Sequence, residues 1–116
     1  AMTSRASGSD CAVVLCTAPQ SAAAALARGL VEQRLCACVN VLPGVRSFFR
    51  WEGVVQAADE VLLVVKTTRS ALAALQDRLV AMHPYDVPEF VAFDVAAGLP
   101  GYLNWIIESV EGPGGS

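Results

Sequence analysis

The segment from Val54 to Thr67 most constrains the fold, because it is a long extended run with an apolar centre. Its stretch VLLVVK is apolar at consecutive positions, which is typical of a strand buried on both faces in the middle of a sheet. The preceding segments 36–42 and 45–51 are also extended in character, and Glu52-Gly53 fits a two-residue turn. The sequence therefore predicts a β-hairpin whose second strand is central.

This hairpin is too long for a domain of this size. At about 3.3 Å per residue, a strand over 54–67 reaches about 46 Å. A compact domain of about 100 residues has a radius of gyration of about 13 Å and a diameter of about 35 Å. We therefore expect the tip of the hairpin to protrude from the rest of the molecule.

The other elements follow from hydrophobic periodicity. Apolar runs predict strands, spacings of three and four residues predict amphipathic helices, and Pro84 ends the second helix at His83. The elements are strands over 11–17 and 89–95, helices over 20–35 and 100–110, and a helix from Thr68 or Ser70 to His83. Strand, helix, strand, strand, helix, strand and a closing helix predict a ferredoxin-like α+β sandwich with an antiparallel sheet and both long helices on one face.

The chain length predicts a single domain. Of its 116 residues, we expect 10–110 to fold as one unit and the Gly-, Ser- and Pro-rich tails 1–9 and 111–116 to be disordered. Hydrophobic residues make up 54% of the chain and charged residues 16%, which is a high ratio for so small a globule. We therefore expect part of the apolar surface to lie against another chain.

Charge and hydropathy exclude two classes of partner. The net charge is −3 and Lys and Arg do not cluster, so we expect no nucleic-acid binding. No apolar run approaches the roughly 20 residues of a membrane span, and the beginning of the chain lacks a signal peptide, so we expect no membrane partner and a cytoplasmic location. The four cysteines are then expected to be reduced thiols, mostly small core residues.

The hairpin tip carries aromatic residues that one chain alone leaves exposed. Alternation places Val45, Phe49 and Trp51 on one face, and Arg46, Phe48 and Arg50 on the other. An isolated two-stranded ribbon is marginally stable in water, and an aromatic one tends to aggregate. We expect Val45, Phe49 and Trp51 to contact a neighbouring subunit in a closed assembly. The alternative is that these aromatics fold back onto their own sheet.

Six motifs in order resemble one family. They are LCTAP (15–19), LCACVNVLPGV (35–45), WEG (51–53), KTT (66–68), HPYDVPE (83–89) and YLNW (102–105). Over residues 12–108 the chain is similar to the CutA divalent-cation tolerance proteins. The resemblance implies a ferredoxin-like subunit and a homotrimer built by strand pairing between subunits. It also implies an architecture like that of the nitrogen-regulatory signalling trimers, which bind small effectors in clefts between subunits.

The resemblance also implies a metal site. Family members have been linked to copper and other divalent cations, with a cysteine and a histidine as ligands, which correspond to Cys16 and His83 here. Some members have two adjacent histidines where this chain has Met82-His83. Two or three ligands do not form a closed four-coordinate site, so we expect weak binding of Cu(I), Cu(II) or another divalent cation, and no required cofactor. The alternative for His83 is that its ring interacts with the carbonyls at the end of its helix.

A second candidate site is a cleft between subunits. Lys66 and Glu89 are charged residues near the ends of buried strands, where a counter-ion is needed. If they meet Tyr85 and Trp51 of a neighbouring chain, the cleft suits a small anionic or zwitterionic ligand. A purely structural ion pair between Lys66 and Glu89 is the alternative.

Catalysis is not expected. A hydrolase with this fold would need a phosphate-binding loop with an arginine, and none follows the first strand. Nothing in the sequence supplies an orienting group or oxyanion donors for a Cys16–His83 pair. Three functions stay open: a metal-handling trimer, a sensor of a small effector, and a structural or anchoring scaffold.

Overall fold

The computed structural model describes residues 10–110, so the predicted disordered tails lie outside the described residues. The elements are β1 (Cys11–Ala18), α1 (Gln20–Glu32), β2 (Cys38–Trp51), β3 (Val54–Thr68), the short 3-10 helix η2 (Arg69–Ala71), α2 (Leu72–Met82), β4 (Val91–Asp94) and α3 (Pro100–Ser109). Among these helices, none has both the length and the apolar character to span a membrane.

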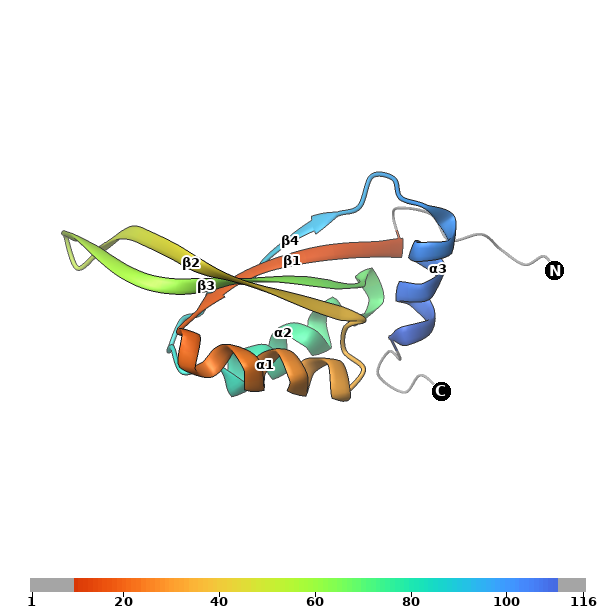
Figure 1. Cartoon of the computed structure of the whole chain (residues 1–116), viewed down its shortest axis with the longest axis horizontal. Coiled ribbons are helices and arrows are strands. Elements are labelled where there is room, and N and C mark those ends of the chain that lie inside the picture. The colour runs from red at the N-terminus through yellow and green to blue at the C-terminus, as the bar shows by residue number, and fades with distance from the viewer. Residues whose placement is uncertain (1–9, 111–116) are drawn as a thin grey trace.

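The four strands form one antiparallel sheet in the order β2-β3-β1-β4. Helices α1 and α2 lie on one face of this sheet, and α3 lies at the end opposite the hairpin tip (Figure 1). The prediction of a ferredoxin-like α+β sandwich is confirmed. It holds because β3, with its apolar centre, pairs with both β1 and β2 and so lies inside the sheet.

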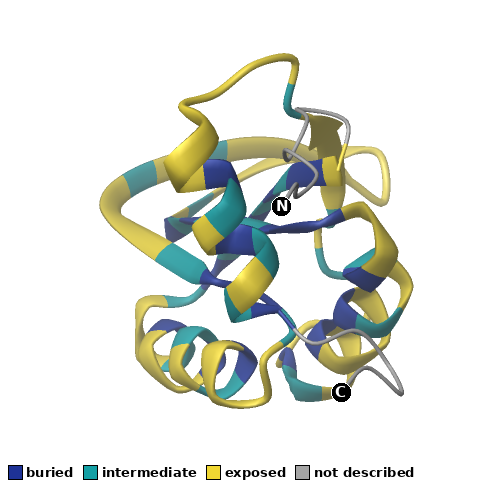
Figure 2. Ribbon diagram, turned by 90° about the vertical axis from the view of Figure 1, so that its right-hand side faces the viewer, coloured by how far each residue is buried: buried dark blue, intermediate teal, exposed yellow. Residues whose placement is uncertain are grey.

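The main core fills the space between the sheet and the two long helices (Figure 2). Strand residues with even numbers in β1 and odd numbers in β3 point into it, because paired residues such as Val14 and Val65 share a face. The helices contribute leucines at spacings of three and four, which include Leu26, Leu30, Leu75 and Leu79. Burying each such leucine stabilises the fold by about 1.5–3 kcal/mol.

The other face of the sheet is covered only at one end. There, α3 packs with Leu103 and Ile106 over Cys11. Further along, Leu15 and Val64 are half-buried, and on β4 the side chains of Val91 and Phe93 are 45% and 51% exposed. A single chain, over its described residues, therefore leaves a broad apolar area of the sheet accessible.

The hairpin protrudes as predicted. Strand β1 pairs with β3 only from Val61 onward, so residues 54–60 pair with 45–51 alone. We call this two-stranded part the ribbon; it gives the molecule extents of 56 × 26 × 22 Å (Figure 1). Glu52 and Gly53 both have positive φ, 50° and 80°, as a type I′ turn requires, so the predicted two-residue turn is confirmed.

The predicted helix ends differ from the observed ones at α1, which ends at Glu32 and not at 35. Arg34 adopts φ 60°, and the N–H groups of Arg34 and Leu35 donate to the carbonyls of Val31 (2.9 Å) and Leu30 (3.1 Å). This is a Schellman motif, which usually has glycine at the position of Arg34. Strand β4 is also shorter than predicted, 91–94 and not 89–95.

Candidate functional site

The single histidine lies just beyond α2 and uses both ring nitrogens. The Nε2 atom of His83 is 2.9 Å from the carbonyl oxygen of Thr17, and Nδ1 accepts a hydrogen bond from the N–H of Tyr85 at 3.1 Å. An accepting Nδ1 carries no proton, so Nε2–H donates to Thr17. The ring therefore links the end of α2 to β1 and does not bind the last carbonyls of its own helix, the alternative considered from sequence.

Cys16 lies close by, but in the core. Its side chain is fully buried between the sheet and the helices. Burial, with smaller contributions from Glu89 and Glu60, raises the pKa of the Cys16 thiol to about 12. The thiolate is the form that binds metals, and this environment disfavours it.

The predicted metal pair therefore does not fit a preformed copper site. The structure brings Cys16 and His83 together, since the ring binds the carbonyl of the residue after Cys16. Neither offers a free donor, because one is a buried thiol and the other has both nitrogens engaged. Across residues 10–110, no three His, Cys, Asp or Glu side chains gather as metal ligands do.

A cleft of about 920 Å³ lies between the ribbon and the segment 85–89. We call it the ribbon cleft. Its walls are formed by Thr17, Ser47, Phe48, Phe49, Trp51, Gln56, Glu60, Tyr85, Asp86, Val87, Pro88 and Glu89. The hydroxyl of Tyr85 donates to Oε2 of Glu60 at 2.7 Å. Burial, followed by this bond, raises the pKa of Tyr85 to about 12, so the phenol stays a donor at neutral pH.

Three of the four predicted cleft residues meet within one chain. Trp51, Tyr85 and Glu89 all line the ribbon cleft. Lys66 does not, because it pairs in register with Val13, four residues and about 13 Å along β1 from Thr17. Its ammonium contacts Oδ1 of Asn40 rather than Glu89.

The predicted interface residues lie on the ribbon as expected from alternation. Val45, Phe49 and Trp51 share the face of Glu60 and Gln56 in the β2–β3 register. Phe49 and Trp51 are 41% and 55% exposed and also line the ribbon cleft, whereas Val45 is half-buried and does not. Phe49 and Trp51 thus belong to both the predicted interface and the cleft, and Phe48 lines the cleft from the opposite face of the ribbon.

Glu60 is the site residue that sequence reasoning missed. Only 9% of its surface is exposed, and it stands directly before the apolar run 61–65 of β3. The argument that singled out Lys66, an isolated charge at the edge of an apolar run, applies equally to Glu60. An isolated charge beside an apolar run was therefore the sequence feature that could have identified Glu60.

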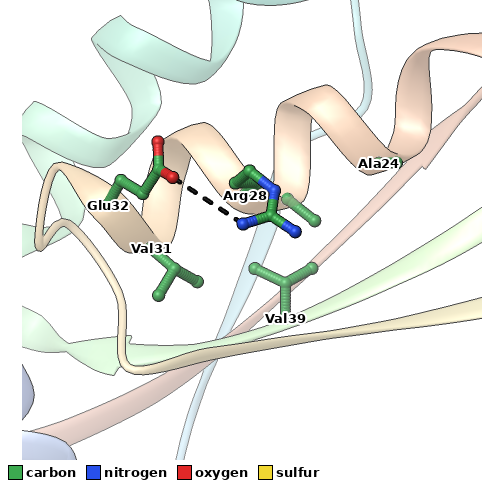
Figure 3. Close-up of a pocket in the computed structure, with 6 residues that line it drawn as sticks. Ala24, Arg28, Val31, Glu32 and Val39 are labelled. Carbon is green, nitrogen blue, oxygen red and sulfur yellow. Dashed lines mark ion pairs between the residues drawn. The ribbon is translucent and has the colours of Figure 1, made fainter.

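A shallower groove of about 370 Å³ lies between α1 and β2 (Figure 3). Arg28 and Glu32 form an i,i+4 ion pair along α1 at 3.8 Å, and both side chains are mostly exposed. The rest of the groove is lined by Ala24, Ala27, Val31 and Val39. This is the composition of a solvent-facing helix surface.

Together, these features define a class of ferredoxin-like α+β proteins in which a long β2–β3 ribbon borders a side-chain cleft. Comparison with known families agrees with that class. The profile of the CutA1 divalent ion tolerance proteins matches residues 12–109. The chain belongs to this family, and the resemblance noted from its motifs is confirmed.

Two bacterial relatives are similar over nearly their whole length. A divalent-cation tolerance protein CutA from Thermus thermophilus is 49% identical over 98 residues, which cover 84% of this chain and 95% of that protein. One from Pectobacterium atrosepticum is 44% identical, over 88% of this chain and 94% of that protein. The crystal structure of CutA from Xylella fastidiosa superposes with a TM-score of 0.87 at 40% identity, over 89% of this chain and 100% of that one.

Proposed function

We propose that the protein is a cytoplasmic homotrimer that acts in tolerance to divalent cations, catalyses no reaction and binds copper or other divalent cations only weakly. Membership of the divalent ion tolerance family supports the tolerance role. The four cysteines are all free thiols, which suits a reducing compartment.

The exposed ribbon is the main observation that supports the homotrimer. Its residues have no third strand within the described chain, and on its predicted contact face Phe49, Trp51 and Val54 are 41%, 55% and 60% exposed. The open face of the sheet adds further apolar area, including Phe93. Such surfaces are covered by association in soluble proteins. Three-fold closure satisfies every copy at once.

The environments of Cys16 and His83, the two residues that a Cys–His mechanism would use, support the absence of catalysis. A Cys–His nucleophile needs a thiolate and a base with a free nitrogen. The pKa of Cys16 is raised to about 12, and the imidazole of His83 is committed on both sides. Among the described residues, this pair offers no activated nucleophile.

Sedimentation of the reduced protein at micromolar concentration tests the assembly. We expect a species of about three times the 12.1 kDa chain mass. A single 12.1 kDa species would overturn the homotrimer.

Copper titration tests the metal proposal. With reductant present, we expect binding that is weak and that changes little in Cys16→Ser and His83→Ala, because the folded chain offers neither donor. Chelator treatment should leave the melting temperature unchanged, because only a bound metal stabilises by mass action. Tight stoichiometric binding that both variants abolish would show instead that Cys16 and His83 rearrange into a metal site.

The ribbon cleft favours a second candidate function, the sensing of a small effector. Its volume of about 920 Å³ lies in the range of small-molecule sites, and it combines aromatic walls with a few polar groups. Under this candidate, a ligand held between the ribbon and segment 85–89 would report to a sister chain, because Phe49 and Trp51 belong to both the cleft and the proposed interface.

A further inference from the structure

We propose that the ribbon cleft binds a small organic cation, a substituted ammonium, between its aromatic wall and its carboxylates. This inference rests on the effector candidate above and names the chemical class of the ligand. It also reverses the anionic or zwitterionic ligand expected from sequence, because that expectation depended on Lys66.

The charges that line the cleft have one sign. Glu60, Asp86 and Glu89 are on its walls, and no Lys or Arg is among its lining residues. The arginines of the ribbon, Arg46 and Arg50, alternate onto the opposite face, where Arg46 lies over the ring of Phe48, 5.8 Å from its centroid, and neither arginine lines the cleft. Arg46 is also paired with Asp59 at 3.1 Å. An anionic ligand would meet carboxylates without a counter-charge, whereas a cation meets several.

The aromatic side chains supply a second attraction for cations. Trp51, Phe49 and Tyr85 line the same cleft as the acids. Ring faces attract ammonium groups, by about 0.5–1 kcal/mol when exposed and about 2 kcal/mol when desolvated. A simple metal ion would gain less, because Asp86, Glu89 and Glu60 do not gather as a ligand cluster within residues 10–110. The combination selects an organic cation.

Glu60 is the anchor in this arrangement. It is only 9% exposed, and Tyr85 occupies one carboxylate oxygen, Oε2. The second carboxylate oxygen of Glu60 has no protein partner among the described residues. Every fully buried side-chain oxygen in that part of the chain does have a hydrogen bond. This oxygen must therefore remain accessible, and Glu60 lines the ribbon cleft. A fixed, largely desolvated carboxylate strengthens the attraction for a cation.

Tryptophan fluorescence tests the proposal in the full-length chain. The protein has two tryptophans, so Trp105→Phe leaves Trp51 as the only reporter. The probes are benzyltrimethylammonium chloride and sodium benzenesulfonate, which share an aromatic body and differ in charge, in about 150 mM salt to screen distant charges. We expect saturable quenching by the cation with an affinity at least about tenfold above that of the anion.

Charge-removing variants locate the binding. Glu60→Gln and Glu89→Gln should each weaken the cation about fivefold, and Glu89→Gln keeps the test valid if Glu60→Gln does not fold, because Glu89 is exposed. The matched control is Glu108→Gln on α3, which removes the same charge at the end opposite the hairpin tip (Figure 1). It should bind the cation as the parent does.

The outcomes distinguish an error in the proposed ligand class from failure of the effector candidate itself. If the sulfonate binds more tightly than the ammonium, the cleft remains an effector site and the proposed ligand class is wrong. If Glu108→Gln weakens the cation as much as Glu89→Gln does, binding is only general surface charge and the proposal fails. If neither probe perturbs Trp51, both the ligand class and the effector candidate fall.

Discussion

At the residue scale, His83 begins a hydrogen-bonded chain that crosses three elements. Its ring binds Thr17 of β1 and accepts from the N–H of Tyr85, whose hydroxyl in turn binds Glu60 of β3. The rings of His83 and Tyr85 are also in contact, with centroids 4.7 Å apart. The histidine therefore positions the segment that forms one wall of the ribbon cleft.

The buried thiols make stability depend on alkaline pH. Burial raises the pKa of Cys16 and of Cys36 to about 12, from an ordinary value of 9.0. Above about pH 9 the unfolded chain releases these protons while the folded chain retains them, so stability falls as pH rises from 9 toward 12. The slope is up to about 1.4 kcal/mol per pH unit for each thiol.

Urea unfolding at about pH 8, 9 and 10, under reductant and at one protein concentration, measures this slope. Cys16→Ala combined with Cys36→Ala should make the pH dependence shallower, because both thiols with pKa values raised to about 12 are then absent. An equal pH dependence in the parent and the double variant would refute the assignment.

At the scale of elements, Arg34 joins the end of α1 to the end of α3. Its Nη2 donates to the carbonyl of Glu108 at 2.9 Å and its Nε to that of Ser109 at 3.3 Å, while its backbone has φ 60°. The residue thus ends one helix and provides charge-assisted hydrogen bonds to the last turn of another.

Two substitutions separate these roles. Arg34→Ala loses the bonds to α3 and keeps the unfavourable backbone, so it should destabilise by about 1–3 kcal/mol. Arg34→Gly loses the same bonds but accepts positive φ, so it should be about 1 kcal/mol more stable than Arg34→Ala. Chemical unfolding checks the order, and faster amide exchange in α3 should accompany both variants. Equal stabilities for the two would mean that backbone strain at Arg34 contributes nothing.

Periodicity was sufficient to predict the order of the elements, but not their contacts. The end of α1 was missed because its Schellman motif has arginine where glycine is the usual signal. Cys16 and His83 both contact the carbonyl of Thr17 in the structure, yet burial and tautomer, which decide whether they can bind metal, depend on tertiary packing. The partner of Lys66 is set by strand register, which places it beside Asn40 and not Glu89.

At the scale of the whole molecule, the two faces of the ribbon are predicted to differ in what they do. Phe49→Ser with Trp51→Ser should convert the proposed homotrimer to a 12.1 kDa species in sedimentation, because it removes the predicted contact face. The matched pair Phe48→Ser with Val55→Ser changes the opposite face, where the side chains are 69% and 61% exposed, and should leave the mass unchanged. If only the Phe48→Ser, Val55→Ser pair dissociates the assembly, the interface lies on that face of the ribbon and the prediction is wrong.

The unpaired ribbon also has a genetic consequence under the proposed homotrimer. When the ribbon of each chain packs against a neighbouring chain, a folded chain with a defective ribbon still assembles with intact chains. If two alleles are expressed equally and mix at random, about one assembly in eight contains only sound chains. A ribbon lesion would then act dominantly, whereas a lesion that unfolds the core would remove its own chain before mixing and act recessively.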